Sequence, residues 1–304
     1  MKRILAAIIM AGGMAAAAGW VLAAPDPLPA SALKPHTANI ENGKRLYTAS
    51  GCLSCHLPAK DDKQADMSLP SGGRLLKTPA GAFYPPNITP DADTGIGGWT
   101  DIQFVNAVKR GISPDGRHYL PAFPYTSYSK MSDADVLDIK AYMDTLKPVQ
   151  AANRPAELPL GLPVETIMRR SLGMWKLTSG FEPAEFVKDA AKDDVWNQGA
   201  YLVQGPGHCA ECHTPRDWAM ALDTSRWMAG GPHPEGEGKV PSLRSLKSRG
   251  RFKDAADLAL ALEFGETLGY DKMSSGGMAA VQTNMSKLPA EDRTAIATYL
   301  MSLE

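Results

Sequence analysis

The sequence predicts an all-α protein built from two tandem helical domains that follow an apolar N-terminal segment. Three observations support this prediction. Apolar residues recur at helical spacing behind recognisable helix caps, few segments have the alternation of strands, and the pattern C-x-x-C-H occurs twice in similar surroundings. With 304 residues, of which 44% are apolar, the chain is long enough to fill a core in each of two domains.

The N-terminal segment, residues 1–24, has the composition of a targeting sequence. Lys2 and Arg3 precede an uncharged run from Ile4 to Ala24, and Val21-Leu22-Ala23 fits the small-x-small pattern of a cleavage site. The same run is long enough to span a bilayer core. We therefore expect either a cleaved signal peptide or an uncleaved membrane anchor. In both cases the rest of the chain is expected to be periplasmic, soluble or anchored to the inner membrane.

The first domain is expected over residues 37–148. Thr100 and Gln103 form a capping box before one helix, which Gly111 ends. Ser132 caps the closing helix, whose apolar residues recur at helical spacing. They are Val136, Ile139, Met143 and Leu146.

The second domain is expected over residues 194–304, after a proline-rich linker at 149–193 in which Ile167 to Leu177 could form a short helix. Asp254 and Gly265 delimit a middle helix. Pro289, at a first helical position, opens the closing helix.

Each domain carries one C-x-x-C-H motif near its N-terminus. Two thiols three residues apart can form thioethers with the two vinyl groups on one edge of a haem, and the following imidazole can then ligate the iron. The motifs use all four cysteines of the chain. Neither a four-cysteine zinc site nor a thioredoxin-like pair requires a histidine after each pair. We therefore expect two covalently bound haem c groups, held by Cys52, Cys55, His56, Cys209, Cys212 and His213.

The sixth iron ligand is expected from the loop before each closing helix, where methionine and histidine are the common choices. In the second domain Met278 follows two glycines that allow close approach to a flat cofactor; Met285 and Met273 are the alternatives. In the first domain Met131 is the only methionine of the loop. His118 is its rival, and an open iron is the third possibility.

The chain resembles the di-haem cytochrome c subunits that accompany periplasmic dehydrogenases of the quinohaemoprotein alcohol dehydrogenase type. The matching stretches are residues 86–91, 94–99, 119–128 and 209–216. The resemblance implies two class I cytochrome c-like domains. It also implies electron transfer from a periplasmic dehydrogenase subunit to a downstream cytochrome or terminal oxidase. Many relatives have methionine, the expected sixth ligand, where this chain has Phe123. Because phenylalanine cannot ligate iron, the resemblance implies that another residue is the sixth ligand of the first haem, and Met131 is the nearest candidate. Many relatives also have three haem motifs, whereas this chain has two.

The net charge of the chain argues against one class of function. With 32 basic and 33 acidic residues, the net charge of −1 gives no basic excess for binding nucleic acid.

An enzyme of the di-haem peroxidase or thiosulfate-oxidising type is the alternative to an electron carrier, and it would need one open iron. A structural role for the haems is a third, weaker interpretation.

Overall fold

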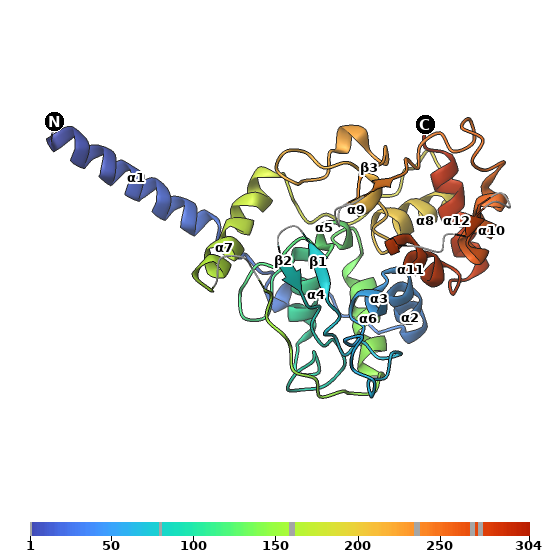
Figure 1. Ribbon diagram of the computed structural model, residues 1–304, viewed down its shortest axis with the longest axis horizontal. Helices are drawn as coiled ribbons and strands as arrows, with labels where there is room; N and C mark the ends of the chain where they lie inside the picture. The colour runs from blue at the N-terminus through green and yellow to red at the C-terminus, as the bar shows by residue number, and fades with distance from the viewer. Residues whose placement is uncertain (1, 79–80, 158–161, 234–237, 268–270, 273–275) are drawn as a thin grey trace.

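The computed structural model describes residues 2–78, 81–157, 162–233, 238–267, 271–272 and 276–304. Over these residues the chain is mostly helical (Figure 1), as the sequence predicts. Its strands form short antiparallel pairs: β1 (Leu76–Thr78) with β2 (Gly81–Phe83), β3 (Gly231–Pro232) with β4 (Lys239–Val240), and β5 (Glu266–Thr267) with β6 (Asp271–Lys272). Such short ladders are hairpin stems between helices and do not form a separate layer.

Residues 37–148, called the first half below, contain α2 (Ile40–Ala49), α3 (Cys52–Cys55), α4 (Asp101–Arg110), α5 (Tyr125–Tyr128) and α6 (Asp133–Asp144). The caps predicted for two of these helices are confirmed. Thr100 and Gln103 form the capping box of α4, and Gly111 ends that helix with a left-handed φ of 59°. The Ser132 side chain accepts a hydrogen bond from the Asp135 N–H at the start of α6.

Residues 194–304, the second half, contain α8 (Asp194–Gln204), α9 (Ala210–His213), α10 (Ala255–Phe264), α11 (Gly276–Met285) and α12 (Ala290–Met301). Asp254 caps α10 and Gly265 ends it, as predicted. Pro289 was predicted at the first helical position, but it is the N-cap residue of α12, with an extended ψ of 149°. The helix therefore begins one residue later. Two short 3-10 helices, Ala30–Ala32 and Thr224–Arg226, lie in the connections.

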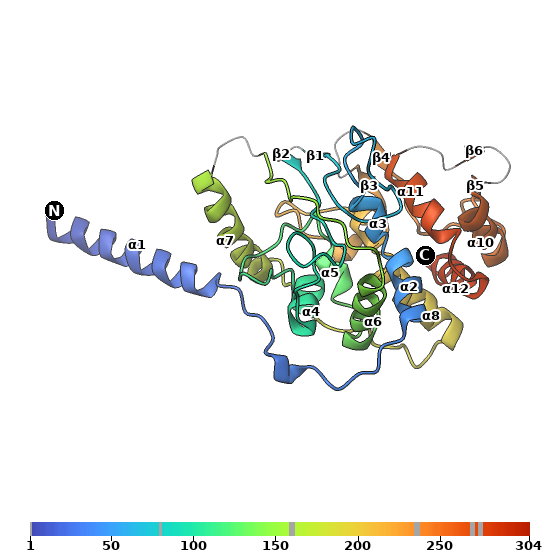
Figure 2. The same cartoon turned by 90° about the horizontal axis from the view of Figure 1, so that it is seen from below.

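Two further helices lie outside these halves. The N-terminal α1 (Lys2–Leu22) extends away from the rest of the molecule (Figures 1 and 2), and its apolar window is long enough to cross a membrane. The segment between the halves contains α7 (Leu162–Thr178), which is longer than the short helix expected from Ile167. In both views α7 lies beside the end of α1 where the chain enters the body.

The first and last helices of each half cross at a glycine. A Cβ on Gly43 of α2 would overlap the backbone carbonyl of Asp138 in α6, and a Cβ on Gly199 of α8 would overlap that of Ala295 in α12. Only glycine lets backbones approach this closely. The same crossing therefore occurs in both halves, and each brings apolar side chains together. The fully buried ones include Leu46, Val136, Leu202 and Val203.

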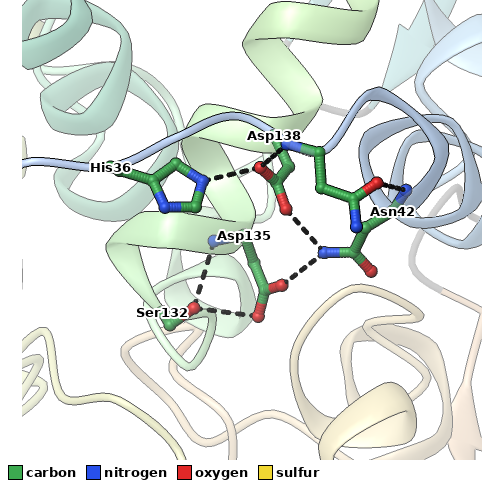
Figure 3. Close-up of polar contacts among 6 residues, drawn as sticks. His36, Asn42, Ser132, Asp135 and Asp138 are labelled. Carbon is green, nitrogen blue, oxygen red and sulfur yellow. Dashed lines mark hydrogen bonds and ion pairs between the residues drawn. The ribbon is translucent and has the colours of Figure 1, made fainter.

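Polar side chains also join α2 to α6 (Figure 3). The Asp138 carboxylate accepts hydrogen bonds from the Asn39 N–H at 2.7 Å and from the Asn42 amide at 2.8 Å, and it lies 2.7 Å from the His36 ring. Burial alone would raise the pKa of Asp138, but these hydrogen bonds lower it. The carboxylate therefore stays charged and holds the segment before α2 against α6.

The two helix pairs contact each other reciprocally. Arg45 of α2 makes a two-point contact with Asp292 of α12, at 2.5 and 2.6 Å. Tyr201 of α8 donates a hydrogen bond to Asp135 of α6 at 2.5 Å. Because Arg45 and Tyr201 stand at matching distances after Gly43 and Gly199, the two contacts mirror each other. The halves are thereby held in one orientation.

Candidate functional site

Each C-x-x-C-H motif forms a single helical turn, α3 or α9, directly after the first helix of its half. Residues three apart on such a turn lie on one face, so the two thiols of each pair can face a common partner. Cys52 and Cys209 are half-buried, whereas Cys55 and Cys212 are exposed. Burial raises the pKa of Cys52 and of Cys209 to about 12, which keeps both thiols neutral.

The histidine of each motif is oriented by a proline carbonyl. His56 Nδ1 lies 2.7 Å from the Pro86 oxygen, and His213 Nδ1 lies 2.8 Å from the Pro241 oxygen. A carbonyl only accepts hydrogen bonds, so Nδ1 carries the proton in both rings and Nε2 keeps a lone pair. Burial lowers the pKa of both histidines, which favours this neutral form. The arrangement fits an axial ligand whose other nitrogen is held by a backbone acceptor.

A glycine with a left-handed backbone also lies next to the histidine of each motif, and we did not predict these glycines from the sequence. Gly72 and Gly230 have φ values of 76° and 74°, and a Cβ on either would overlap the backbone around Pro86 or Pro241. Their N–H groups donate to the carbonyls of His56 at 2.9 Å and of His213 at 2.7 Å. The available signal was a Gly-Gly pair at almost the same distance after each motif.

The four cysteines of the two motifs do not come together at one site. Within the described parts of the chain, no group of three or more His, Cys, Asp or Glu side chains is placed to hold a metal ion. The two motifs are therefore separate sites, each with two thiols and one imidazole.

The two motif turns are nevertheless linked through the contact between the halves. The Tyr128 hydroxyl donates to the carbonyl of Ser50, just before the first motif, at 2.8 Å. The same ring packs edge-on against His208, just before the second motif, with centroids 5.6 Å apart. Glu211, inside the second motif, accepts hydrogen bonds from Thr126 at 2.6 Å and Ser127 at 2.8 Å. Each motif is thus attached to α5 in the first half.

Met278 lies in the first turn of α11, whereas the sequence analysis placed it in a glycine-rich loop. The cause is only partly local: the run from Met278 to Gln282 contains good helix formers, but a contact with the end of α10 through Gln282 also stabilises the helix. Met278 is half-buried. Met285, at the other end of α11, is buried in the core beside Leu288. Met273 lies outside the described residues.

Met131 lies just before α6 and is almost completely buried. Its Cγ is 3.6 Å from the position that a Cβ on Gly205 would take, so it packs where the halves meet. Phe123 packs between the rings of Tyr119 and Tyr128, at centroid distances of 5.9 and 5.6 Å. Phe123 is therefore part of an aromatic cluster.

His118, the rival of Met131, uses both ring nitrogens elsewhere. Its Nε2 lies 3.0 Å from the Ala23 carbonyl oxygen, and its Nδ1 lies 3.1 Å from Lys176 Nζ. The carbonyl can only accept a hydrogen bond, so Nε2 carries the ring proton and donates it, and Nδ1 accepts a hydrogen bond from Lys176. Burial, and then the charge of Lys176, lower the pKa of His118 and keep the ring neutral. In this arrangement neither nitrogen is left over for iron.

Comparisons with known proteins agree with the two-motif geometry. A family model described as cytochrome c matches residues 40–147. A di-haem c-type cytochrome from Cereibacter sphaeroides is 42% identical over 99% of this chain and 98% of its own length.

Other similar proteins are subunits of dehydrogenases. The cytochrome subunit of fructose dehydrogenase from Gluconobacter japonicus is 36% identical over 91% of this chain and 54% of its own length. The cytochrome c subunit of gluconate 2-dehydrogenase from Pantoea cypripedii is 34% identical over 88% of this chain and 60% of its own length. The chain thus spans little more than half of these two relatives.

Proposed function

Since the chain belongs to the di-haem cytochromes c, we propose that it binds two haems c and carries electrons from a periplasmic dehydrogenase to a downstream cytochrome or terminal oxidase. The observation that carries the proposal is the repeated pairing of a motif histidine with a proline carbonyl. The names of the relatives support a dehydrogenase as the donor and favour electron transfer over catalysis by the chain itself.

The residues of each motif have distinct roles in this proposal. Cys52 and Cys55 hold one haem through thioethers, and Cys209 and Cys212 hold the other. His56 and His213 ligate the irons through Nε2, while the proline carbonyls fix the rings and raise the basicity of the ligating nitrogens. Bound haem c supplies one-electron redox chemistry at its iron.

We assign Met278 to the second iron and Met131 to the first as sixth ligands. The hydrogen bonds of His118 to Ala23 and Lys176 weigh against a bis-histidine first haem. A neutral, soft thioether favours ferrous iron and raises the reduction potential, as suits a carrier near the end of an electron-transfer chain.

We further propose that α1 is retained as a membrane anchor and that the two halves are separate cytochrome c domains within one body. Ala23, at the expected cleavage site, is buried, and its carbonyl accepts from His118. Cleavage after Ala23 would leave a buried imidazole N–H without its acceptor, at a cost of about 1–3 kcal/mol. This cost favours the anchor over the cleaved signal peptide.

An anaerobic reductive titration of the full-length holoprotein tests the electron-carrier function. We expect two one-electron steps in the haem α-band and no spectral change on adding carbon monoxide to the ferrous protein. Uptake of a single electron per chain would contradict the two-haem proposal. A carbon monoxide complex combined with turnover of peroxide would instead identify an enzyme with one open iron.

A further inference from the structure

The end of α1 is fixed to α7 by several contacts. Arg170 of α7 donates to the Trp20 carbonyl at 3.0 Å, and its guanidinium lies 4.9 Å from the centre of the Trp20 ring. Gly173 of α7 leaves room for the backbone of Ala23, which a Cβ at this position would overlap. If α1 crosses a membrane, these contacts hold α7 within about one helical turn of the bilayer surface.

The inner face of α7 is attached to the body by a buried lysine. Lys176 Nζ donates to the carbonyls of Arg110 at 2.6 Å and Gly111 at 3.1 Å, and it lies 4.5 Å from the centre of the Tyr125 ring. Burial lowers the pKa of Lys176 to about 7. A buried amine with several hydrogen-bond partners fixes which side of the helix faces inward.

The opposite side of α7 carries apolar side chains that the body does not cover. Ile167, Met174 and Leu177 are all exposed, and their spacing places them on one side of the helix. Leu177 has 58% of its surface exposed, although a leucine in a core would be covered. An unpartnered row of this kind marks an interaction surface.

A tight loop adds an aromatic side chain beside this row. The indole N–H of Trp175 in α7 donates to the Ala219 carbonyl at 2.8 Å, which attaches residues 217–220 to the helix. Asp217 accepts from the N–H groups of Ala219 and Ala221, at 2.8 and 3.0 Å, and so fixes the turn. On this fixed loop Trp218 is 95% exposed. A tryptophan presented in this way is typical of the membrane interface, where one side of the ring is apolar and the other is wet.

We infer that these side chains, together with the exposed Met220 of the same loop, lie in the headgroup region of the lipid bilayer beside α1. They are called the α7 face and comprise Ile167, Met174, Leu177, Trp218 and Met220. The inference rests on the proposed anchoring by α1. One observation favours lipid over a protein partner: α7 contacts the end of an apolar helix whose described residues the rest of the protein leaves uncovered.

Site-directed spin labelling of the full-length holoprotein in phosphatidylcholine–phosphatidylglycerol vesicles tests the inference. Single cysteines are introduced as Leu177→Cys and Trp218→Cys on the α7 face, and as Met10→Cys inside α1. Leu260→Cys is the matched control, because Leu260 is also exposed but lies on α10, at the end of the molecule opposite α1 (Figure 1). For each label, the relaxation caused by oxygen, which enters lipid, is compared with that caused by a water-soluble nickel complex.

We expect the label at position 10 to respond several-fold more to oxygen than to nickel, the label at 260 to show the reverse, and the labels at 177 and 218 to have an oxygen-to-nickel ratio several-fold above that at 260. If position 10 responds as a lipid site while 177 and 218 behave like 260, the membrane-facing role of α7 is wrong although the anchor stands. If position 10 is itself accessible to nickel, the anchor fails, and the inference fails with it. A haem absorbance ratio equal to that of the unsubstituted protein confirms that each variant is intact.

Discussion

At the scale of single residues, two glycines decide how closely the chain can pass behind the motif histidines. Gly72 and Gly230 each combine a left-handed φ with backbone atoms where a Cβ would lie. We expect Gly72→Ala to lower the free energy of unfolding by about 3 kcal/mol, because strain and overlap add. Denaturant unfolding of the holoprotein measures the effect.

Gly116 offers a matched control. It has a φ of 73°, but nothing lies within 4 Å of its missing Cβ. Gly116→Ala should therefore show only the conformational strain, about 1 kcal/mol. Equal losses in the two variants would show that the backbone behind His56 is not crowded.

The protonation of His118 is expected to make the stability of the contact between α7 and the end of α1 depend on pH. Its pKa is lowered from the ordinary 6.5 by burial and by the charges of Lys176 and Arg170, against the opposing effect of the Ala23 carbonyl. As the pH falls below about 6.5, His118 becomes protonated in the unfolded chain but stays neutral in the folded chain. The free energy of unfolding therefore decreases. Above that pH the stabilisation is fully present.

We therefore expect the melting temperature of the protein to fall more steeply between about pH 6.5 and pH 5 than that of the His118→Gln variant. Glutamine keeps a hydrogen-bonding side chain but does not titrate in this range. Other histidines titrate in both proteins, so the difference isolates His118. Parallel pH profiles would mean that His118 is not held neutral between Ala23 and Lys176.

At the scale of elements, capping residues made three helices predictable. Thr100, Ser132 and Asp254 begin their helices as expected because a side-chain oxygen at that position satisfies a free backbone N–H. We expected a loop around Gly276-Gly277, but these residues begin the helix α11. The helix is stabilised by its contact with α10, since Gln282 donates to the carbonyls of Leu262 and Glu263 at the end of that helix. A tertiary contact of this kind cannot be seen in the local sequence.

The sixth ligands are also tested at this scale, because each candidate belongs to a different element. We expect Met278→Ala in α11 and Met131→Ala before α6 each to remove about half of the far-red ferric charge-transfer band of methionine-ligated haem. Each should also lower one reduction potential. Met285→Ala is the control: it removes a buried methionine from the same helix as Met278 and should change stability without changing the band. If Met131→Ala leaves the band intact while His118→Ala shifts one haem, the first haem is bis-histidine.

At the scale of the whole molecule, the reciprocal contacts Arg45–Asp292 and Tyr201–Asp135 hold two similarly built halves together. The C-x-x-C-H spacing predicted the motif residues from sequence because the chemistry fixes that spacing. Neither the orientation of the halves nor the Tyr128 contact between the motif turns could be predicted, because both depend on residues far apart in the chain. The proline acceptors Pro86 and Pro241 also lie far from their histidines in the sequence, so these contacts could not be predicted either.

The central claim is that both motifs attach haem, and intact-mass measurement of the denatured full-length protein tests it most directly. Thioether bonds survive denaturation, so we expect the polypeptide mass plus two haems, and a mass with only one haem in a Cys209→Ala, Cys212→Ala variant. A mass corresponding to one haem or none in the unsubstituted protein would contradict it.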